Sequence, residues 1–184
     1  MRLTITPLDP SMHNRRAFSC GSSSIDTYFH EVAAQASKQL HAQTYVLTDT
    51  DDHSALRTVL GFYTLTPHEY RDEEMDSTTA RALKLKNLRR IPAILLGQLG
   101  VTVDWQHRRL GPMLLEHAFR KALFASCCVG GALLVTDPID DAARSFYRRF
   151  EFQELAGGSR LYLAMKTLAK LYPDVVAAAK SSVA

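Results

Sequence analysis

Residues 94–124, ILLGQLGVTVDWQHRRLGPMLLEHAFRKALF, constrain the fold of this chain more than any other segment. An apolar strand leads into a short basic turn, and a helix begins at Gly111-Pro112. The first N–H groups of a helix have no partner inside the helix and lie at the positive end of its dipole. Arg108 and Arg109 add formal positive charge at the same place. The segment therefore predicts an anion site, suited to a phosphate or pyrophosphate, between a strand and a helix.

The remaining pattern predicts an α/β fold with a mixed sheet that is mostly antiparallel at first. Two of its strands, at 44–48 and at 58–66, flank a polar turn and are expected to form an antiparallel hairpin that ends at Pro67. The other expected strands lie at 2–8, 93–103, 132–137 and 160–165, and helices are expected from 22–24 to about 40, from 111, and around 140–150.

Three further features describe the organisation of the chain. Residues 67–91 form a long polar connection, which in a compact domain is usually functional or flexible. The segment after the last strand is rich in Ala, Ser and Lys and is expected to be frayed over its last residues. With 184 residues and no internal repeat, we expect one domain over 1–184.

In the first helix, apolar positions recur at helical spacing. Ile25, Tyr28, Phe29, Val32, Ala36 and Leu40 are expected to form its buried face.

The charge of the chain is mildly basic, with a formal net charge of +3. Lysine and arginine recur as pairs on separate elements, and such pairs could converge on one face to hold a polyanion. Scattered, solvated surface arginines explain the same pattern equally well. The net charge alone therefore does not establish a nucleic-acid partner.

The cysteines and the N-terminus point to the cytoplasm. Three cysteines, of which Cys127 and Cys128 are adjacent, form no disulfide framework and have no metal-ligand spacing, so no metal is expected. We expect reduced thiols that are buried or partly buried, with Cys127-Cys128 at the buried end of a helix. No apolar run is long enough for a signal peptide or a membrane span.

Several motifs in this order resemble the GCN5-related N-acetyltransferase (GNAT) superfamily. The run Gln106-His107-Arg108-Arg109-Leu110-Gly111 is similar to the superfamily loop Gln/Arg-x-x-Gly-x-Gly/Ala, which binds the acetyl-CoA pyrophosphate through backbone amides. The resemblance implies a GNAT fold, with the sheet splayed at its central strands, and acetyl-CoA as the acetyl donor.

The resemblance extends over nearly the whole chain to the toxin arm of bacterial GNAT toxin–antitoxin pairs. It rests on Phe18 to Tyr28 and on the runs TYVLTD, GFYTLT, IPAILLGQLGV and ARSFYRRFEF. Such toxins acetylate the amino group of an aminoacyl-tRNA and thereby block translation, and a ribbon-helix-helix antitoxin covers them. The alternatives are a GNAT enzyme that acts on a protein or small-molecule amine, and a catalytically weakened binding module. Whether the chain forms a homodimer stays open.

The resemblance also implies the cofactor-binding residues. Leu99, Gly100 and Val101 are expected to offer backbone groups to the pantetheine arm, as a strand edge does to a peptide. Val103 is expected to begin the splay of the central strands that opens this strand edge. The pyrophosphate cradle is expected to comprise Arg108, Arg109, Leu110, Gly111, Pro112 and Met113.

Tyr147 is the expected catalytic acid. Acetyl transfer to an amine expels a thiolate, which a phenol within hydrogen-bond reach can protonate. Periodicity alone favours a core tyrosine on an amphipathic helix, and only the resemblance reverses that interpretation. The amine of an aminoacyl ester has a lower pKa than a lysine side chain, so no strong general base is required.

Two residues depart from the superfamily pattern. Arg109 stands where the loop has glycine, and it either keeps a compatible backbone conformation and adds a salt bridge or partly blocks the site. Glu151 replaces a glycine after the helix that carries Tyr147, so it must bear strain there or the helix must end differently.

Four arginines are candidates for binding tRNA phosphates: Arg89, Arg90, Arg148 and Arg149. The alternative is that they hold the acidic tail of the antitoxin or a dimer interface. Both roles are compatible, because an antitoxin that mimics the charge of the substrate would use the same surface.

Overall fold

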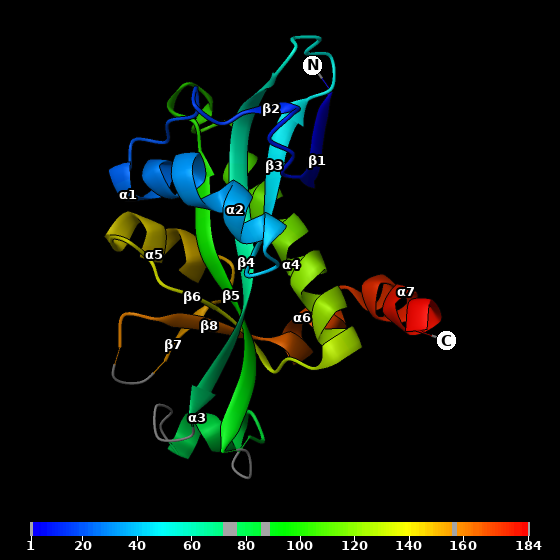
Figure 1. Ribbon diagram of the computed structural model, residues 1–184. Helices are drawn as coiled ribbons and strands as arrows, with labels where there is room; N and C mark the ends of the chain where they lie inside the picture. Colours follow the sequence, from blue (N-terminus) through cyan, green and yellow to red (C-terminus); the bar gives the residue numbers. More distant parts are fainter. Residues whose placement is uncertain (1, 72–76, 86–88, 156–157, 184) are drawn as a thin grey trace. The chain divides into compact units, whose positions relative to one another are not determined.

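The computed structural model describes residues 2–71, 77–85, 89–155 and 158–183. The chain divides into two compact units, Met1–Thr66 with Gly97–Ala118 and Pro67–Leu96 with Phe119–Ala184. Three long elements run from one unit into the other: β4 (Arg57–Arg71), β5 (Arg90–Val101) and α4 (Leu110–Val129) (Figure 1).

The first unit is built on an antiparallel ladder. Strand β3 (Gln43–Asp49) pairs antiparallel with both β1 (Leu3–Pro7) and β4, and the short β2 (His13–Asn14) pairs parallel with β4. The register of β3 against β4 places Val46 opposite Phe62. The hairpin predicted over 44–66 is therefore confirmed.

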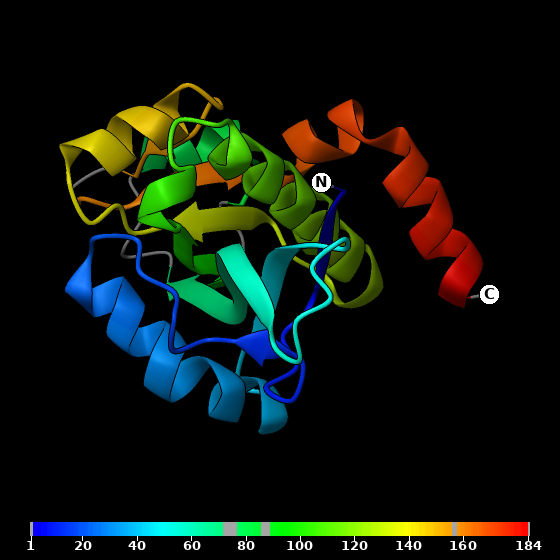
Figure 2. The same cartoon turned by 90° about the horizontal axis from the view of Figure 1, so that it is seen from above.

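Helical segments cover one face of this ladder, namely α1 (Ser23–Thr27), the π-helical η1 (Tyr28–Val32) and α2 (Ala33–Lys38) (Figure 2). Phe29 stacks on Phe62 with ring centroids 4.2 Å apart. The apolar cluster beneath the helices comprises Leu8, Phe18, Ile25, Phe29, Ala33, Val46, Val59 and Phe62. Burial of these side chains is the main contribution that holds the helices to the strands.

The buried face predicted for the first helix is partly wrong. Val32 is 45% exposed and Leu40 is 86% exposed, whereas Ala33 is fully buried. The π-helical turn widens the helix, so the buried stripe passes from Phe29 to Ala33. Leu40 lies beyond the end of α2, with a φ of 59°.

The other face of β4 lies against the first half of α4. Gly61 and Phe62 are neighbours on a strand and point to opposite faces. A Cβ atom at Gly61 would lie 2.8 Å from Leu114 Cδ1 and 3.0 Å from the carbonyl oxygen of Gly100. A side chain does not fit there, so this glycine permits β4, β5 and α4 to pack closely.

The second unit contains a mixed sheet. The strand β6 (Leu133–Thr136) pairs parallel with Ala93 to Leu96 of β5 and antiparallel with β8 (Leu161–Ala164), which in turn pairs with β7 (Gln153–Glu154). Its apolar core comprises Tyr70, Ala80, Leu85, Ile91, Ala93, Leu133, Val135, Leu155 and Tyr162. The helix α5 (Asp141–Arg148) connects β6 to β7.

One strand that enters the second unit differs from expectation. The strand β4 does not end at Pro67 but continues to Arg71, because proline has an extended-compatible φ and removes only one ladder donor. The connection that follows contains α3 (Ser77–Ala82). Residues 72–76 and 86–88 of this predicted connection lie outside the described part of the chain.

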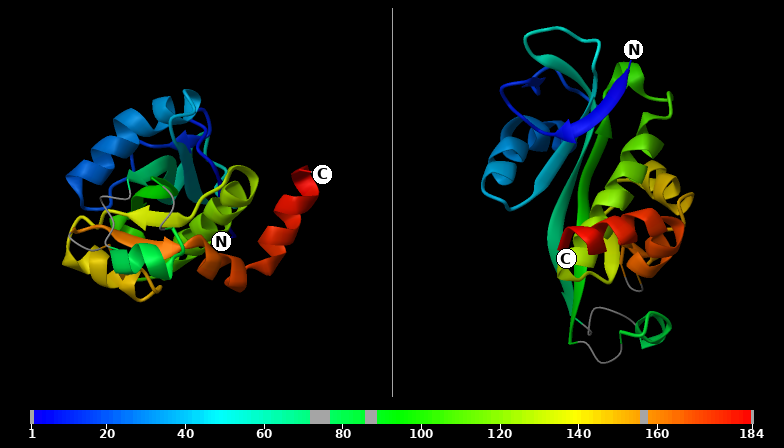
Figure 3. Two further views of the ribbon diagram at one scale, coloured as in Figure 1. Left: turned by 90° about the horizontal axis from the view of Figure 1, so that it is seen from below. Right: turned by 90° about the vertical axis from the view of Figure 1, so that its right-hand side faces the viewer.

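The C-terminal segment, expected from its composition to be frayed, contains α6 (Met165–Leu171) and α7 (Pro173–Val183) (Figure 3). Arg120 is ion-paired with Asp174, and its guanidinium lies 5.1 Å from the ring centroid of Tyr172. Val175 and Ala179 are buried. The sparse apolar residues of α7 are therefore sufficient to hold it within the second unit.

Candidate functional site

The turn before α4 has an unusual backbone. A short 3-10 helix, Val103–Trp105, is followed by Gln106, and both His107 and Arg109 have positive φ, of 61° and 62°. Arg108, between them, is not among the residues with positive φ, so the sign alternates along the turn. Successive N–H groups in such an alternation point into one concavity, which binds anions. The helix α4 begins directly after it, at Leu110, and adds its own N-terminal N–H groups.

Side-chain and backbone hydrogen bonds hold this turn in place. The Gln106 side-chain amide donates to the carbonyl oxygen of Cys20 at 2.9 Å and to that of Val101 at 3.1 Å. The N–H of Val103 and the hydroxyl of Thr102 both donate to the carbonyl oxygen of Ser19, at 2.9 and 3.1 Å. The turn is therefore tied to the segment before α1 and is preorganised for a ligand.

The turn is also exposed and cationic. His107, Arg108 and Arg109 are all exposed. The Arg108 guanidinium lies 4.6 Å from the centroid of the Trp105 ring, a cation–π contact that restrains the side chain. The N–H concavity and the arginine charges together form a site for a multiply charged anion.

Arg109 retains the backbone conformation that glycine would adopt. Its φ of 62° lies in the left-handed region, which costs a residue with a side chain roughly 1–2 kcal/mol. This left-handed φ agrees with the first of the two alternatives expected from the sequence, a compatible backbone. The hydrogen bonds of Gln106 and the start of α4 at Leu110 show how the neighbouring residues accommodate it.

The end of β5 lies beside this turn in the first unit. A Cβ atom at Gly100 would lie 3.2 Å from Ile25 Cγ2 and 3.3 Å from Phe18 Cζ, so a larger residue would crowd the core there. On the side of this strand end that faces β4, the N–H of Thr102 donates to the carbonyl oxygen of Leu60 at 3.0 Å. The parallel ladder to β6 includes no residue of β5 beyond Leu96. Val103, which follows β5, is 53% exposed.

Tyr147 lies on α5 and is 7% exposed. Its ring contacts those of Phe146 and Phe152, with centroids 5.2 and 5.3 Å away. Burial raises the pKa of Tyr147 to about 12, although a hydrogen bond with the Thr136 side chain opposes the rise. The phenol is therefore fully protonated at neutral pH, as a proton donor must be.

The end of α5 is closed by a Schellman motif in which Glu151 takes the glycine position. The N–H of Glu151 donates to the carbonyl oxygen of Arg148 at 3.1 Å, and that of Phe152 donates to the carbonyl oxygen of Tyr147 at 3.4 Å. Glu151 has a φ of 64°. The helix thus ends as a glycine would end it, and the residue bears the strain.

The four arginines expected to bind tRNA have different surroundings within the second unit. Arg90 is paired with Glu69 at 2.8 Å, and Arg148 is paired with Glu154. The Arg149 guanidinium lies 5.6 Å from the ring centroid of Phe146. Arg89 is exposed. The pairing of Arg90 and Arg148 with carboxylates reduces the charge that they present to an anion.

The cysteine prediction is wrong for the adjacent pair. Cys127 and Cys128 are exposed, because the last turn of α4 is not covered by the core. Cys20 is partly buried, and this burial raises the pKa of its thiol to about 11. Across the ranges that the structure describes, no helix has the length and apolar character needed to cross a membrane.

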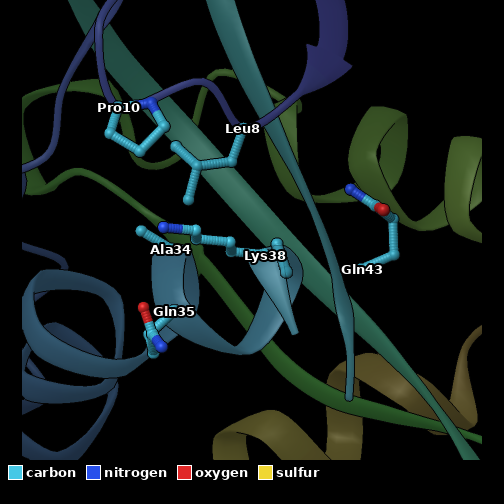
Figure 4. Close-up of a pocket in the computed structure, with 7 residues that line it drawn as sticks. Leu8, Pro10, Ala34, Gln35, Lys38 and Gln43 are labelled. Carbon is cyan, nitrogen blue, oxygen red and sulfur yellow. The ribbon is translucent and has the colours of Figure 1, made fainter. Parts of the chain in front are cut away.

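The first unit also contains a cavity of about 460 Å³ between α2, the start of β3 and the segment after β1 (Figure 4). It is lined by Leu8, Pro10, Ala34, Gln35, Ser37, Lys38 and Gln43. No residue predicted to bind the cofactor or to act in catalysis is among them.

The predicted residues fall into two groups. The strand end Leu99 to Val101, Val103 and the turn from Arg108 to Met113 lie together in the first unit. Tyr147 and the four arginines belong to the second unit. Sequence reasoning missed Cys20, whose carbonyl oxygen accepts a hydrogen bond from the Gln106 side chain. No local signal could have found it, because the two residues lie 86 positions apart in the chain.

Comparison with known proteins finds similarity to toxins. It is 27% identical over 175 residues to the probable toxin TacT of Sinorhizobium fredii, a match that covers 91% of this chain and 93% of that protein. It is 28% identical over 137 residues to the tRNA-acetylating toxin of Mycobacterium tuberculosis, covering 74% of this chain and 76% of that protein. No protein-family model matches the chain.

Solved structures share its fold. A Tyr-to-Phe mutant of KacT superimposes with a TM-score of 0.83 at 24% identity, over 93% of this chain and 99% of that one. AtaT complexed with acetyl-methionyl-tRNAfMet gives a TM-score of 0.80 at 24% identity, over 92% and 99%. A Tyr-to-Phe mutant of the toxin AtaT bound to acetyl-CoA and the C-terminus of its antitoxin AtaR gives 0.77 at 22%, over 94% and 99%. The comparisons confirm the resemblance to these toxins and the predicted α/β fold with a mixed, mostly antiparallel sheet.

Proposed function

We propose that this chain, which shares its fold with KacT and with the toxin AtaT, is an acetyl-CoA-dependent N-acetyltransferase that acetylates the amino group of aminoacyl-tRNA. The observation that carries the proposal is the turn before α4, which has alternating φ signs although it lacks the expected glycine. The relatives support the substrate, because one is a tRNA-acetylating toxin and AtaT was solved with an acetylated aminoacyl-tRNA. Acetylation of the amino group would block translation.

The residues of the first unit fit acetyl-CoA. The concave N–H groups of 107–111, with Arg108 and Arg109 beside them, match a pyrophosphate in charge and in donor geometry. Pro112 and Met113 complete the first turn of α4. Leu99, Gly100 and Val101 would pair with the amides of the pantetheine arm, and Val103 would border it. We assign these residues to cofactor binding on that basis.

Acetyl-CoA, when bound, supplies an activated acetyl thioester. The chain contributes the binding of the pyrophosphate at the turn and a proton from the Tyr147 phenol. Burial raises the pKa of that phenol to about 12, so the phenol is protonated at neutral pH and has a proton to give when the thiolate leaves. An aminoacyl-ester amine is partly neutral near pH 7, so the proposal requires no strong general base.

The proposal extends to partners. Arg89, Arg90, Arg148 and Arg149 would contact tRNA phosphates, with Arg89 and Arg149 the stronger candidates because Arg90 and Arg148 are paired with glutamates. A ribbon-helix-helix antitoxin would bind the chain, as AtaR binds AtaT. We further propose that the two units act as a single acetyltransferase domain in the cytoplasm.

The test is transfer of radiolabelled acetyl groups from acetyl-CoA to bulk aminoacyl-tRNA. The wild type is expected to label the tRNA, and Tyr147→Phe is expected to bind acetyl-CoA normally and lose turnover by about 100-fold or more. Label that appears only on proteins would overturn the substrate. Full turnover in Tyr147→Phe would overturn the catalytic assignment while leaving the substrate intact.

The alternative of a weakened binding module predicts no thermal shift with millimolar acetyl-CoA. Arg109 and Glu151, the residues that raise this alternative, both adopt the left-handed conformation that glycine would take. This favours an intact site. An N-acetyltransferase for protein or small-molecule amines is distinguished by the acceptor that becomes labelled.

A further inference from the structure

We propose that Asp26 of α1 is a positioning residue for the turn before α4, and that it holds this turn in its ligand-binding conformation through the peptide group that joins Ser19 to Cys20. The inference rests on the proposed binding of acetyl-CoA at the turn. It gives a role to the carboxylate in the segment from Phe18 to Tyr28, which the proposed chemistry does not use.

Both oxygens of the Asp26 carboxylate accept hydrogen bonds from the segment before α1. Its Oδ1 accepts from the backbone N–H of Cys20 at 2.8 Å, and its Oδ2 accepts from the Ser19 hydroxyl at 2.9 Å. Burial acts to raise the pKa of Asp26, but hydrogen bonds from Cys20 and Ser19 hold that pKa below its usual value. The group is therefore an ionised carboxylate at neutral pH, and both donors are bound by a charged acceptor.

The carbonyl oxygens of the same two residues accept hydrogen bonds from the turn. The carbonyl of Ser19 accepts from the N–H of Val103 at 2.9 Å and from the Thr102 hydroxyl at 3.1 Å. The carbonyl of Cys20 accepts from the Gln106 side chain at 2.9 Å. The two-residue segment thus lies between α1 and the turn, with its donors directed to the helix and its acceptors directed to the turn.

One peptide group makes this connection direct. The Cys20 N–H and the Ser19 carbonyl belong to the same planar trans unit, in which the two groups point in opposite directions. The bond from the N–H to Asp26 fixes the orientation of the plane, so the carbonyl oxygen stays directed at Val103. The negative charge on the donor side also polarises the unit and strengthens its carbonyl as an acceptor.

Loss of the carboxylate would change how often the turn is ready for a ligand. All of these residues lie in the first unit. A Ser19–Cys20 peptide that is not held can rotate, and the turn then samples conformations in which its N–H groups no longer converge. A ligand that binds only the converging conformation has an apparent Kd inversely proportional to the population of that conformation. A fall of that population to about one tenth therefore raises Kd about tenfold.

The competing role for Asp26 is to anchor the start of α1 alone. Its backbone N–H donates to the carbonyl oxygen of Ser22 at 2.9 Å, in the first turn of the helix. An anchor of this kind would contribute to folding stability and would leave the turn and its affinity for a ligand unchanged. Ligand affinity therefore distinguishes the two roles.

The chain offers a set of matched variants. Asp26→Ala removes both acceptor oxygens, whereas Asp26→Asn keeps one oxygen for the backbone N–H and places an amide donor beside the hydroxyl, which can accept it. Asp52→Ala is the control, because Asp52 likewise accepts from two backbone N–H groups, those of Ser54 and Thr58 at 3.0 and 2.8 Å, but holds the connection between β3 and β4. Urea unfolding of each variant establishes that the fold is intact, with Asp26→Ser as a substitute if the alanine variant does not fold.

The first readout is calorimetric titration with acetyl-CoA. We expect Asp26→Ala to raise Kd about tenfold, Asp26→Asn to remain within about threefold of wild type, and Asp52→Ala to equal wild type. In acetyl transfer to aminoacyl-tRNA, KM for acetyl-CoA should rise with Kd, while kcat at saturating acetyl-CoA stays within about threefold because the reacting groups are unchanged. A wild-type Kd in Asp26→Ala would overturn the proposal.

The second readout needs no ligand. Amide hydrogen exchange is measured in the free protein at Val103, whose N–H is bonded to Ser19. We expect exchange about tenfold faster in Asp26→Ala and unchanged in Asp52→Ala. Unchanged exchange in Asp26→Ala would refute the connection. If the wild type binds no acetyl-CoA, the proposed function fails on its own, and the exchange comparison still decides whether Asp26 holds the turn.

Discussion

The side-chain amide of Gln106 donates to the carbonyl oxygen of Cys20, 86 residues earlier in the chain, at 2.9 Å. A second bond from the same nitrogen reaches Val101 at 3.1 Å. One side chain therefore connects the anion-binding turn to the end of β5 and to the segment before α1. The turn is held in its alternating conformation before any ligand arrives.

Gln106→Glu is expected to loosen this turn. Glutamate has nearly the same shape, but its carboxylate cannot donate and would face two carbonyl oxygens. Leaving those groups unpaired should cost about 1–3 kcal/mol of unfolding free energy and weaken acetyl-CoA binding. Urea unfolding and calorimetric titration measure the two effects. The exposed Gln35→Glu serves as control, and equal behaviour of the two variants would contradict the assigned role.

Arg109→Gly and Arg109→Val separate backbone conformation from charge. Both remove the guanidinium, but glycine adopts positive φ readily and a β-branched residue does so rarely. We expect the glycine variant to bind acetyl-CoA within about threefold of wild type and the valine variant to lose about tenfold or more, in line with a left-handed penalty of about 1–2 kcal/mol. Titration calorimetry at two salt concentrations measures this. Equal affinities for the two variants would show that the backbone alternation is not what binds the ligand.

Glu151→Gly is expected to stabilise the protein. Glycine relieves the left-handed strain at the end of α5, and after its greater unfolded-state entropy is subtracted the gain should be about 0.5–1 kcal/mol. The same substitution at Glu31, an exposed residue within η1, should instead destabilise by roughly 1 kcal/mol. Thermal and urea unfolding of both variants test the opposite signs. A loss of stability in Glu151→Gly would argue against strain at this residue.

Tyr147 should make the folded state sensitive to alkali. Its folded pKa of about 12 lies above the ordinary value of 10, so between these values the folded state binds more protons than the unfolded state. Its stabilising contribution is thus present below pH 10 and is lost as the pH rises to 12. At pH 11 the loss amounts to about 1.4 kcal/mol. Urea unfolding at pH 8 and pH 11 should show that Tyr147→Phe loses less stability than wild type, with the partly exposed Tyr28→Phe as control.

Sequence periodicity predicted the elements whose apolar residues follow one clear pattern of burial. The strand β3, the start of β4, the end of β5 and the start of α4 lie within one or two residues of expectation. The π-helical turn at Tyr28–Val32 could not be predicted, because a period of 3.6 has no place for the wider turn and so misassigned Val32. The burial of Ala179 on α7 was missed for a related reason, since a single small residue produces a weak apolar signal.

The site was predicted in its outline and not in its detail. The anion turn follows from the strand, the basic residues and the helix start, which are local features. The hydrogen bond from Gln106 to the carbonyl oxygen of Cys20 joins residues 86 positions apart in the chain, and no local pattern encodes it. Whether Arg109 would block the turn was equally undetermined, because a left-handed arginine is decided by the surrounding structure rather than by propensity.

The left-handed arginine in the turn gives this chain something that a glycine cannot. With glycine at position 109, this residue would offer a ligand only its backbone N–H group. Here the same backbone carries an exposed guanidinium. Substitutions at this one position could therefore tune ligand selectivity by side-chain chemistry while leaving the path of the main chain unaltered. We therefore expect the residue that departs from the superfamily pattern to act as an adjustable contact point.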